Sequence, residues 1–193
     1  ARIAADSKYW LWINDQLVIF EGGLKRGPSP SGTYYDPVDI APYLTKGSNT
    51  IAILLWHFGK DGFSHINSGK AALLFEAIAP GLEIVSDASW QCALYEAYQN
   101  TEAPFPNYRM PESNIRFDAR QAITNWNRTS FEGSLPGAVC VGKAGKAPFG
   151  DLVERPIPQW KNSGLLSYVS VRESLRGDTL FCRLPYNAQI TPY

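Results

Sequence analysis

Short apolar segments separated by turn residues dominate this chain, and helical periodicity is nearly absent. Residues 9–13 and 16–20 are two apolar runs joined by Asn14 and Asp15, which both tolerate a left-handed backbone. The best helical candidate, residues 118–126, is short and lacks a sustained apolar stripe. The pattern therefore predicts an all-β chain with a hairpin near its beginning.

The composition supports this prediction. Among the 193 residues, 13% are aromatic and only 19% are charged, a balance typical of β-sheet. The 16 glycines and 14 prolines indicate many turns rather than low complexity. Strands at irregular spacing, without βαβ alternation, favour an antiparallel β-sandwich of the jelly-roll or galactose-binding kind.

Further strands are expected at residues 50–56, 71–78 and 82–85. Residues 50–56 are apolar throughout except for Thr50, which predicts a strand buried on both faces and central in its sheet. Asp87 and Ser89 favour a turn before an aromatic anchor, Trp90.

The two prolines of residues 155–158 exclude both helix and central strand, and we expect a domain boundary there. Residues 1–160 then form one β-sandwich module. Residues 161–193 begin a following β module, with strands at 166–171 and 180–184. Because the chain opens at Ala1 without Met, we also expect it to be a segment of a longer polypeptide, and no signal peptide is recognised in it.

The charge pattern narrows the classes of partner. Lys plus Arg and Asp plus Glu both number 18, giving a net charge of +0, so we expect no nucleic acid partner. The longest uninterrupted apolar stretch, residues 51–56, is far too short for a membrane span, and we expect no membrane insertion. The three cysteines, Cys92, Cys140 and Cys182, match neither a disulfide framework nor zinc-ligand spacing, and we expect them to be small buried residues.

No motif for nucleophilic catalysis, phosphate binding or a zinc helix occurs, and no pair of carboxylates is singled out for glycoside hydrolysis. We therefore predict no catalytic residue in this chain. The strongest candidate for binding is the loop at 56–65, where aromatic rings could stack on a sugar and polar groups could bind its hydroxyls. Its candidate residues are Trp56, His57, Lys60, Asp61, Phe63 and His65.

Other interpretations of this loop remain open. The aromatic rings could pack beneath it while Lys60 and Asp61 form a solvated ion pair. Metal binding by His57 and His65 matches no standard spacing. We therefore expect no metal ligand and no cofactor.

A second candidate is the loop at 21–35, which is rich in Gly, Pro and Ser. Its Lys25, Arg26, Tyr34 and Tyr35 are residue types that line sugar sites and domain interfaces. The alternative is a surface loop that covers a sheet edge.

Several blocks of sequence resemble, in the same order, the N-terminal β-sandwich region of bacterial α-L-rhamnosidases. They are WLWIN at 10–14, DI at 39–40 followed by Leu44, Gly47 and NTI at 49–51, FGKDG at 58–62, Asp87 with Trp90, FDAR at 117–120 and RPIP at 155–158. The resemblance covers residues 3–160. One departure is Asp15, where this family usually has Gly after the Asn.

The resemblance implies a non-catalytic module of a bacterial glycoside hydrolase that acts on terminal L-rhamnose of plant glycans. In that family the catalytic glutamates lie on a downstream α/α barrel, and nothing in this chain resembles that barrel. The N-terminal sandwiches brace the barrel, which would make the downstream catalytic domain a partner. In some relatives a sandwich binds rhamnose, with calcium in certain cases, although no calcium-ligand pattern is recognised here.

The family is typically exported, which implies a periplasmic or secreted location. The alternative function is an independent lectin-like carbohydrate-binding protein. A lectin predicts a complete sandwich with closed edges, whereas a segment of a longer chain predicts missing strands.

Overall fold

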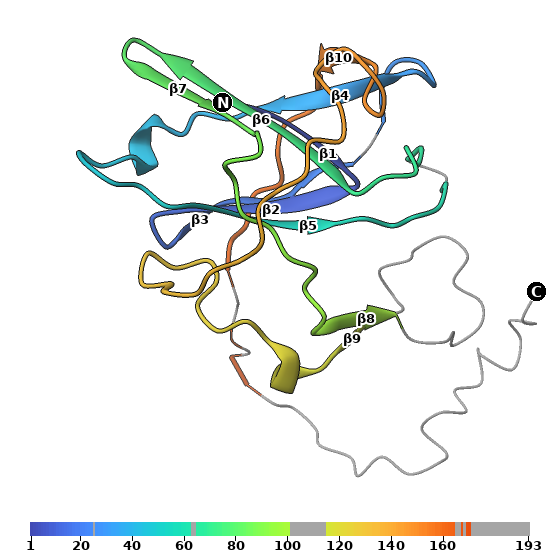
Figure 1. The fold of residues 1–193 in the computed structure, drawn as a ribbon. Helices are drawn as coiled ribbons and strands as arrows, with labels where there is room; N and C mark the ends of the chain where they lie inside the picture. Colours follow the sequence, from blue (N-terminus) through green and yellow to red (C-terminus); the bar gives the residue numbers. More distant parts are fainter. Residues whose placement is uncertain (25, 63–64, 101–114, 165–166, 168, 171–193) are drawn as a thin grey trace, which may run out of the picture.

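A computed structural model describes residues 1–24, 26–62, 65–100, 115–164, 167 and 169–170 (Figure 1). Its strands are β1 (Arg2–Asp6), β2 (Lys8–Ile13), β3 (Gln16–Gly23), β4 (Gly32–Pro37), β5 (Ile51–Trp56), β6 (Ala72–Ala79), β7 (Leu82–Val85), β8 (Tyr98–Asn100), β9 (Ile115–Phe117) and β10 (Asp151–Glu154). Two short 3-10 helices, η1 (Ala41–Tyr43) and η3 (Ala119–Gln121), are the helical elements of these described residues.

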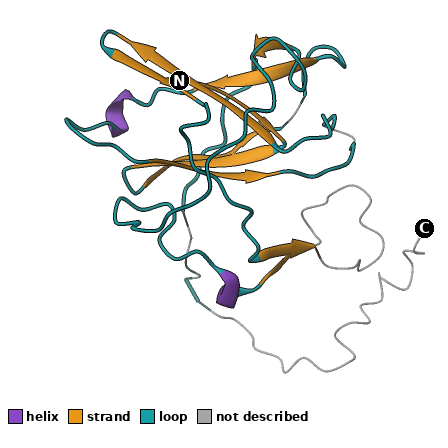
Figure 2. Ribbon diagram, viewed as in Figure 1, coloured by secondary structure: helices purple, strands orange, loops and turns teal. Residues whose placement is uncertain are grey.

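The strands form two sheets that face each other (Figures 1 and 2). One sheet has the strand order β10-β4-β1-β6-β7, and the other has the order β3-β2-β5. The predicted antiparallel β-sandwich is confirmed, with the difference that β10 pairs with β4 in parallel. A small antiparallel pair, β8 with β9, lies beyond the three-stranded sheet (Figure 1).

The predicted hairpin is confirmed as β2 and β3. Asn14 and Asp15 both have positive φ angles, 48° and 70°, as a two-residue hairpin turn with right-handed strand twist requires. The Asn14 side chain also reaches outside the hairpin. Its Nδ2 donates to the Tyr43 carbonyl at 2.9 Å, and its Oδ1 accepts from the Thr50 amide at 3.0 Å. The turn is therefore held against the residue that leads into β5.

The core lies between the two sheets and follows the period-two alternation of strands. Burying an Ile, Leu or Phe side chain stabilises the fold by about 1.5–3 kcal/mol. The fully or almost fully buried apolar residues of this core are Ile3 and Ala5 of β1, Tyr9, Leu11 and Ile13 of β2, and Phe75 and Ala77 of β6.

The prediction that residues 50–56 form a central strand buried on both faces was wrong. β5 pairs with β2 alone among the described strands, so β2 is the central strand of that sheet and β5 lies at its edge. Ile51, Ile53 and Leu55 pack against the core. Leu54 and Trp56 are half-buried on the opposite face. A continuous apolar run indicates that both faces of a strand are apolar, but it does not indicate how many strands pair with that strand.

The outer face of the three-stranded sheet is covered in part by a later segment of the chain. Trp126 packs edge-on against Trp12 of β2, with ring centroids 5.2 Å apart, and it also contacts Tyr95 at 6.1 Å. The predicted turn at 87–90 is confirmed by the Trp90 amide, which donates to the Asp87 carbonyl at 3.2 Å. The Trp90 ring then packs against Phe75 of the core.

The structure also tests the expected helix at 118–126 and the expected burial of the cysteines. The helix considered at 118–126 is reduced to the single 3-10 turn η3, because Asp118 caps the Arg120 amide and no apolar stripe follows to bury a longer helix. The prediction of buried cysteines was wrong for Cys92 and Cys140, which are both exposed. Cys182 lies outside the described residues.

The segment at 151–155 belongs to the sandwich through β10, and the Arg155 amide extends the pairing by donating to the Tyr35 carbonyl at 2.9 Å. The division into residues 1–160 and 161–193 stays a prediction. The strand expected at 180–184 lies outside the described residues, and within 166–171 the structure describes only residues 167, 169 and 170, none of which is in a strand. In the part of the chain that the structure covers, no helix has the length and apolar character needed to cross a membrane.

Candidate functional site

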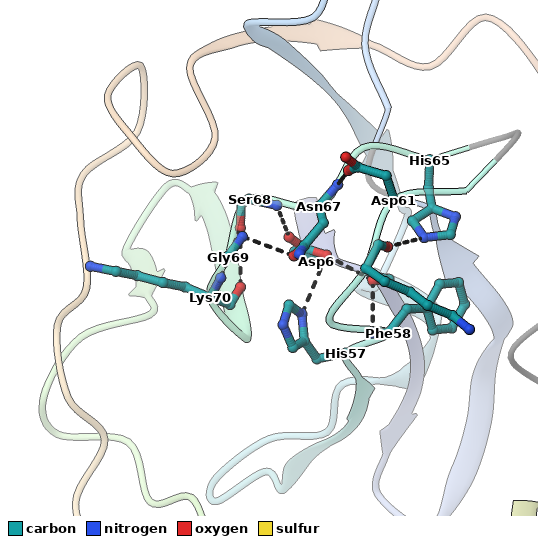
Figure 3. A network of polar contacts seen from close by, with 11 residues as sticks. Asp6, His57, Phe58, Asp61, His65, Asn67, Ser68, Gly69 and Lys70 are labelled. Atoms are coloured by element: carbon teal, nitrogen blue, oxygen red, sulfur yellow. Dashed lines mark hydrogen bonds and ion pairs between the residues drawn. The ribbon is translucent and has the colours of Figure 1, made fainter. Parts of the chain in front are cut away.

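The β5–β6 loop contains most of the candidate sugar-binding residues, and a buried carboxylate anchors it (Figure 3). Asp6, at the end of β1, has an exposed fraction of 0%. Its Oδ2 accepts from the Ser68 amide and its Oδ1 accepts from the Ser7 hydroxyl, both at 2.7 Å. The same Ser7 hydroxyl oxygen accepts from the Phe58 amide at 3.1 Å. Both ends of the loop are thereby fastened to the β1–β2 junction.

His57 lies at the base of this anchor. Its Nδ1 is 3.4 Å from Asp6 Oδ1, and its side chain is 23% exposed. Nδ1 is buried and has no hydrogen-bond partner within the described part of the chain. A protonated His57 would form an ion pair with Asp6 at this distance, so the ring faces the carboxylate rather than an open binding surface (Figure 3).

The other polar groups of the loop bind one another. The Asp61 carboxylate accepts from the Asn67 amide at 2.7 Å, and His65 Nε2 lies 2.7 Å from the Lys60 carbonyl oxygen. His65 is only 5% exposed. The Gly62 amide closes the loop by donating to the His65 carbonyl at 3.2 Å. The side chains of Asp61 and His65 thus form hydrogen bonds within the loop. Asp61 is also exposed, so it can accept a further hydrogen bond.

The aromatic residues of the loop pack together on the outer face of the three-stranded sheet. Trp56 stacks on Trp10 with ring centroids 6.4 Å apart and an interplanar angle of 22°. Phe58 contacts Trp56 edge-on at 5.1 Å and His65 at 4.7 Å. We call Trp10, Trp56, Phe58 and His65 the aromatic cluster. Phe63, which was also expected here, lies outside the described residues.

The structure separates the second set of candidates. Arg26 and Tyr34 line one pocket, of about 230 Å³. Tyr35 lines a different hollow of about 380 Å³, together with Arg2 and Glu76 among others, on the outer face of the five-stranded sheet. The reason is the strand itself, since consecutive residues of β4 point to opposite faces. The expected single lining is therefore divided between two faces, and Lys25, which was also expected there, lies outside the described residues.

Sequence reasoning missed a buried polar network beside the first pocket. Asp36 of β4 is 0% exposed, and its Oδ2 accepts from the Tyr9 hydroxyl at 2.8 Å and from the Gly23 amide at 2.7 Å. Its Oδ1 accepts from Arg155 Nε, and the Arg155 side chain is 10% exposed. Burial, followed by the negative charge of Asp36, raises the pKa of the Tyr9 hydroxyl far above its ordinary value.

No sequence spacing relates Asp36 to Arg155. The available signal was the RPIP block at 155–158, whose arginine stands beside a proline-restricted segment. As for metal ions, no group of three or more His, Cys, Asp or Glu residues in the described ranges is placed to hold one.

No family model and no curated protein matches this chain. A solved structure does match, the GH78 family rhamnosidase of Bacillus sp. GL1, with 31% sequence identity and a TM-score of 0.69. The match covers 82% of this chain and 16% of that protein, so this chain spans a small part of its length. The residues described here therefore have the fold of one part of a GH78 rhamnosidase.

Proposed function

We propose that this chain is a non-catalytic β-sandwich module of an α-L-rhamnosidase-like glycoside hydrolase. The observation that carries the proposal is the match to 16% of a GH78 rhamnosidase at 31% identity, over 82% of this chain. A sandwich that is one part of a much longer enzyme fits the absence of a recognisable catalytic motif from this sequence. The hydrolysis of terminal L-rhamnose then takes place on another domain of the same polypeptide, in the periplasm or outside the cell.

The role that the geometry supports best is bracing that catalytic domain. Buried side chains fasten two segments outside the strands to the sandwich: Asp6 holds the β5–β6 loop, and Asp36 holds the segment after β10. A module whose loops are fixed before it meets its partner loses little conformational entropy on docking. Trp10, Trp56 and Phe58 of the aromatic cluster are half-buried and offer an apolar surface for such contact.

The activity test uses the purified chain and a chromogenic substrate, 4-nitrophenyl α-L-rhamnopyranoside. We expect no release of nitrophenol above the uncatalysed rate, whereas enzymatic turnover would overturn the non-catalytic role. A second measurement separates a module from an independent lectin. Antibodies raised against the chain should detect a native protein several times larger than 193 residues in an extract of the source cells. A native species of the chain's own size would favour the lectin.

A carbohydrate-binding role is a second candidate, and the stacked pair of Trp10 and Trp56 favours it. Two half-buried indoles at an interplanar angle of 22° offer a surface on which the C–H face of a pyranose can stack. Asp61, which is exposed in the loop that follows Trp56, can accept a hydrogen bond from a sugar hydroxyl.

Calorimetric titration with L-rhamnose, galactose and glucose, with and without calcium, tests this candidate. We expect saturable binding of rhamnose that Trp56→Ala weakens. Trp160→Ala is the matched control, because Trp160 is 74% exposed and belongs to no ring contact of the aromatic cluster. If no sugar binds, bracing alone remains; if both variants bind like the parent, the cluster is not the site.

A further inference from the structure

A pocket of about 230 Å³ lies where the end of β3 approaches the chain that follows β10. It is lined by Leu24, Arg26, Tyr34, Arg155, Pro156 and Ile157. Four of these residues offer apolar or aromatic surface and two are arginines. None of the lining residues is acidic, so the pocket presents positive charge within apolar walls.

The guanidinium of Arg155 is only partly used by the protein. Its Nε donates to Asp36 Oδ1, while the remaining oxygen of that carboxylate already accepts from Tyr9 and Gly23. The Arg155 side chain is nine-tenths buried, and its Nη2 is buried without a hydrogen-bond partner among the described residues. A buried donor without a partner is costly, and Arg155 is among the residues that line the pocket.

The charges around the pocket indicate which acceptor fits. Asp36 neutralises the charge of Arg155, and the exposed Arg26 adds a second cation. Among the described residues, these three charges sum to one net positive charge beside the pocket. A guanidinium fork matches the two oxygens of a carboxylate, and one excess cation balances its single negative charge.

The walls indicate what the carboxylate is attached to. Tyr34 is half-buried and Ile157 is 63% exposed, so an aromatic face and an aliphatic edge stand beside the two arginines. Flat or chair-shaped six-membered rings pack well on such surfaces.

We propose that this pocket binds a small organic monocarboxylate with a six-membered ring, with its carboxylate toward Arg26 and Arg155 and its ring against Tyr34 and Ile157. The site does not depend on the proposed function. A sugar acid and an aromatic acid share this chemistry, and the two arms of the experiment distinguish them.

The experiment titrates the purified chain with sodium D-glucuronate in one arm and sodium benzoate in the other, at constant ionic strength, using calorimetry. D-glucose, which lacks the carboxylate, is the ligand control. We expect saturable binding in one arm and none with glucose. Saturation by glucuronate identifies a sugar-acid site, and saturation by benzoate identifies an aromatic-acid site.

Two variants locate the binding without disturbing the buried ion pair. Arg26→Gln removes the exposed cation and should weaken binding about tenfold. Ile157→Glu places a like charge beside the carboxylate and should abolish binding. Arg120→Gln is the matched control, because Arg120 is an exposed arginine outside the lining, and it should bind like the parent. No saturation in either arm, equal binding of glucose, or unchanged binding in both pocket variants would overturn the proposal.

Discussion

Asp36 and Arg155 form a buried ion pair across 119 residues of sequence, joining β4 to the chain immediately after β10. β10 pairs in parallel with β4, and the ion pair attaches the residue that follows β10 to the interior of the sandwich. The other hydrogen-bond donors to Asp36, Tyr9 and Gly23, belong to the other sheet. One carboxylate therefore connects both layers of the sandwich and the late segment at 151–155.

Replacing Arg155 with Met should destabilise the fold by about 3–5 kcal/mol, because Asp36 would remain buried without its counter-ion. Urea denaturation followed by tryptophan fluorescence measures the change. The control is Arg120→Met, which breaks the exposed pair with Asp118 and should leave the urea midpoint nearly unchanged, because solvent screens that pair. Similar losses of stability in the two variants would show that the buried pair of Asp36 and Arg155 contributes no more than the exposed pair.

Tyr9 should make the protein sensitive to alkali. Its pKa is raised in the folded state, by burial first and then by the charge of Asp36, so only the unfolded chain releases this proton at about pH 10. The unfolded state then binds fewer protons than the folded state, and the free energy of unfolding falls as the pH rises above about 10.

The variant Tyr9→Phe removes this titration. We expect a less steep loss of stability above about pH 10 than in the parent. At pH 7 the variant should be less stable by about 1.5–3 kcal/mol, since Asp36 loses a hydrogen bond. Urea midpoints measured from pH 7 to pH 11 give both quantities, and parallel pH profiles for parent and variant would contradict the assignment.

Asp6 should control the order of the β5–β6 loop. The variant Asp6→Asn cannot accept from both Ser7 and Ser68 with equal geometry, because one carboxylate oxygen becomes an amide donor. We expect faster amide hydrogen exchange at Ser68 and at Phe58, while the amides of β2 stay protected. Asp61→Asn, which alters an exposed bond within the same loop, is the control. Unchanged exchange at Ser68 in the Asp6 variant would refute the anchoring role.

Asp15 should stabilise the fold more than glycine would, although its turn position favours glycine. Glycine relieves the positive φ angle of 70°, but Asp15 also accepts from the Thr129 amide at 2.6 Å and the Thr129 hydroxyl at 3.0 Å. We expect Asp15→Gly to be less stable than the parent by about 1 kcal/mol, with the lost hydrogen bonds outweighing the relieved strain.

Thermal unfolding of a further variant, Asp15→Asn, separates the effect of backbone strain from that of the lost hydrogen bonds. Asn keeps an acceptor and tolerates the left-handed backbone. The Asn variant should lie between the parent and the Gly variant. A Gly variant more stable than the parent would mean that the turn conformation outweighs the contact with Thr129.

The sequence alone determined the features that depend on neighbours in the chain. Apolar runs identified β2, β3, β5, β6 and β7, and Asn14 with Asp15 identified the hairpin, because both signals act within a short stretch of chain. The sequence did not identify β4, since residues 21–35 were expected to form a loop. The likeness to rhamnosidases could also be recognised from short blocks, and the matching solved structure supports it at the level of the fold. The sequence could not rank the strands within a sheet, since an apolar run such as residues 50–56 does not record which strands pair with it.

Only the tertiary structure decided which distant groups meet. Asp6 with Ser68, and Asp36 with Arg155, are pairs whose spacing in sequence carries no periodic signal. The strand alternation in β4 divided Tyr34 from Tyr35, and the packing of the loop turned His65 inward. The physical reason is that burial and hydrogen bonding depend on three-dimensional neighbours, which the folding of both sheets brings together, whereas propensity and turn chemistry are already present in the local chain.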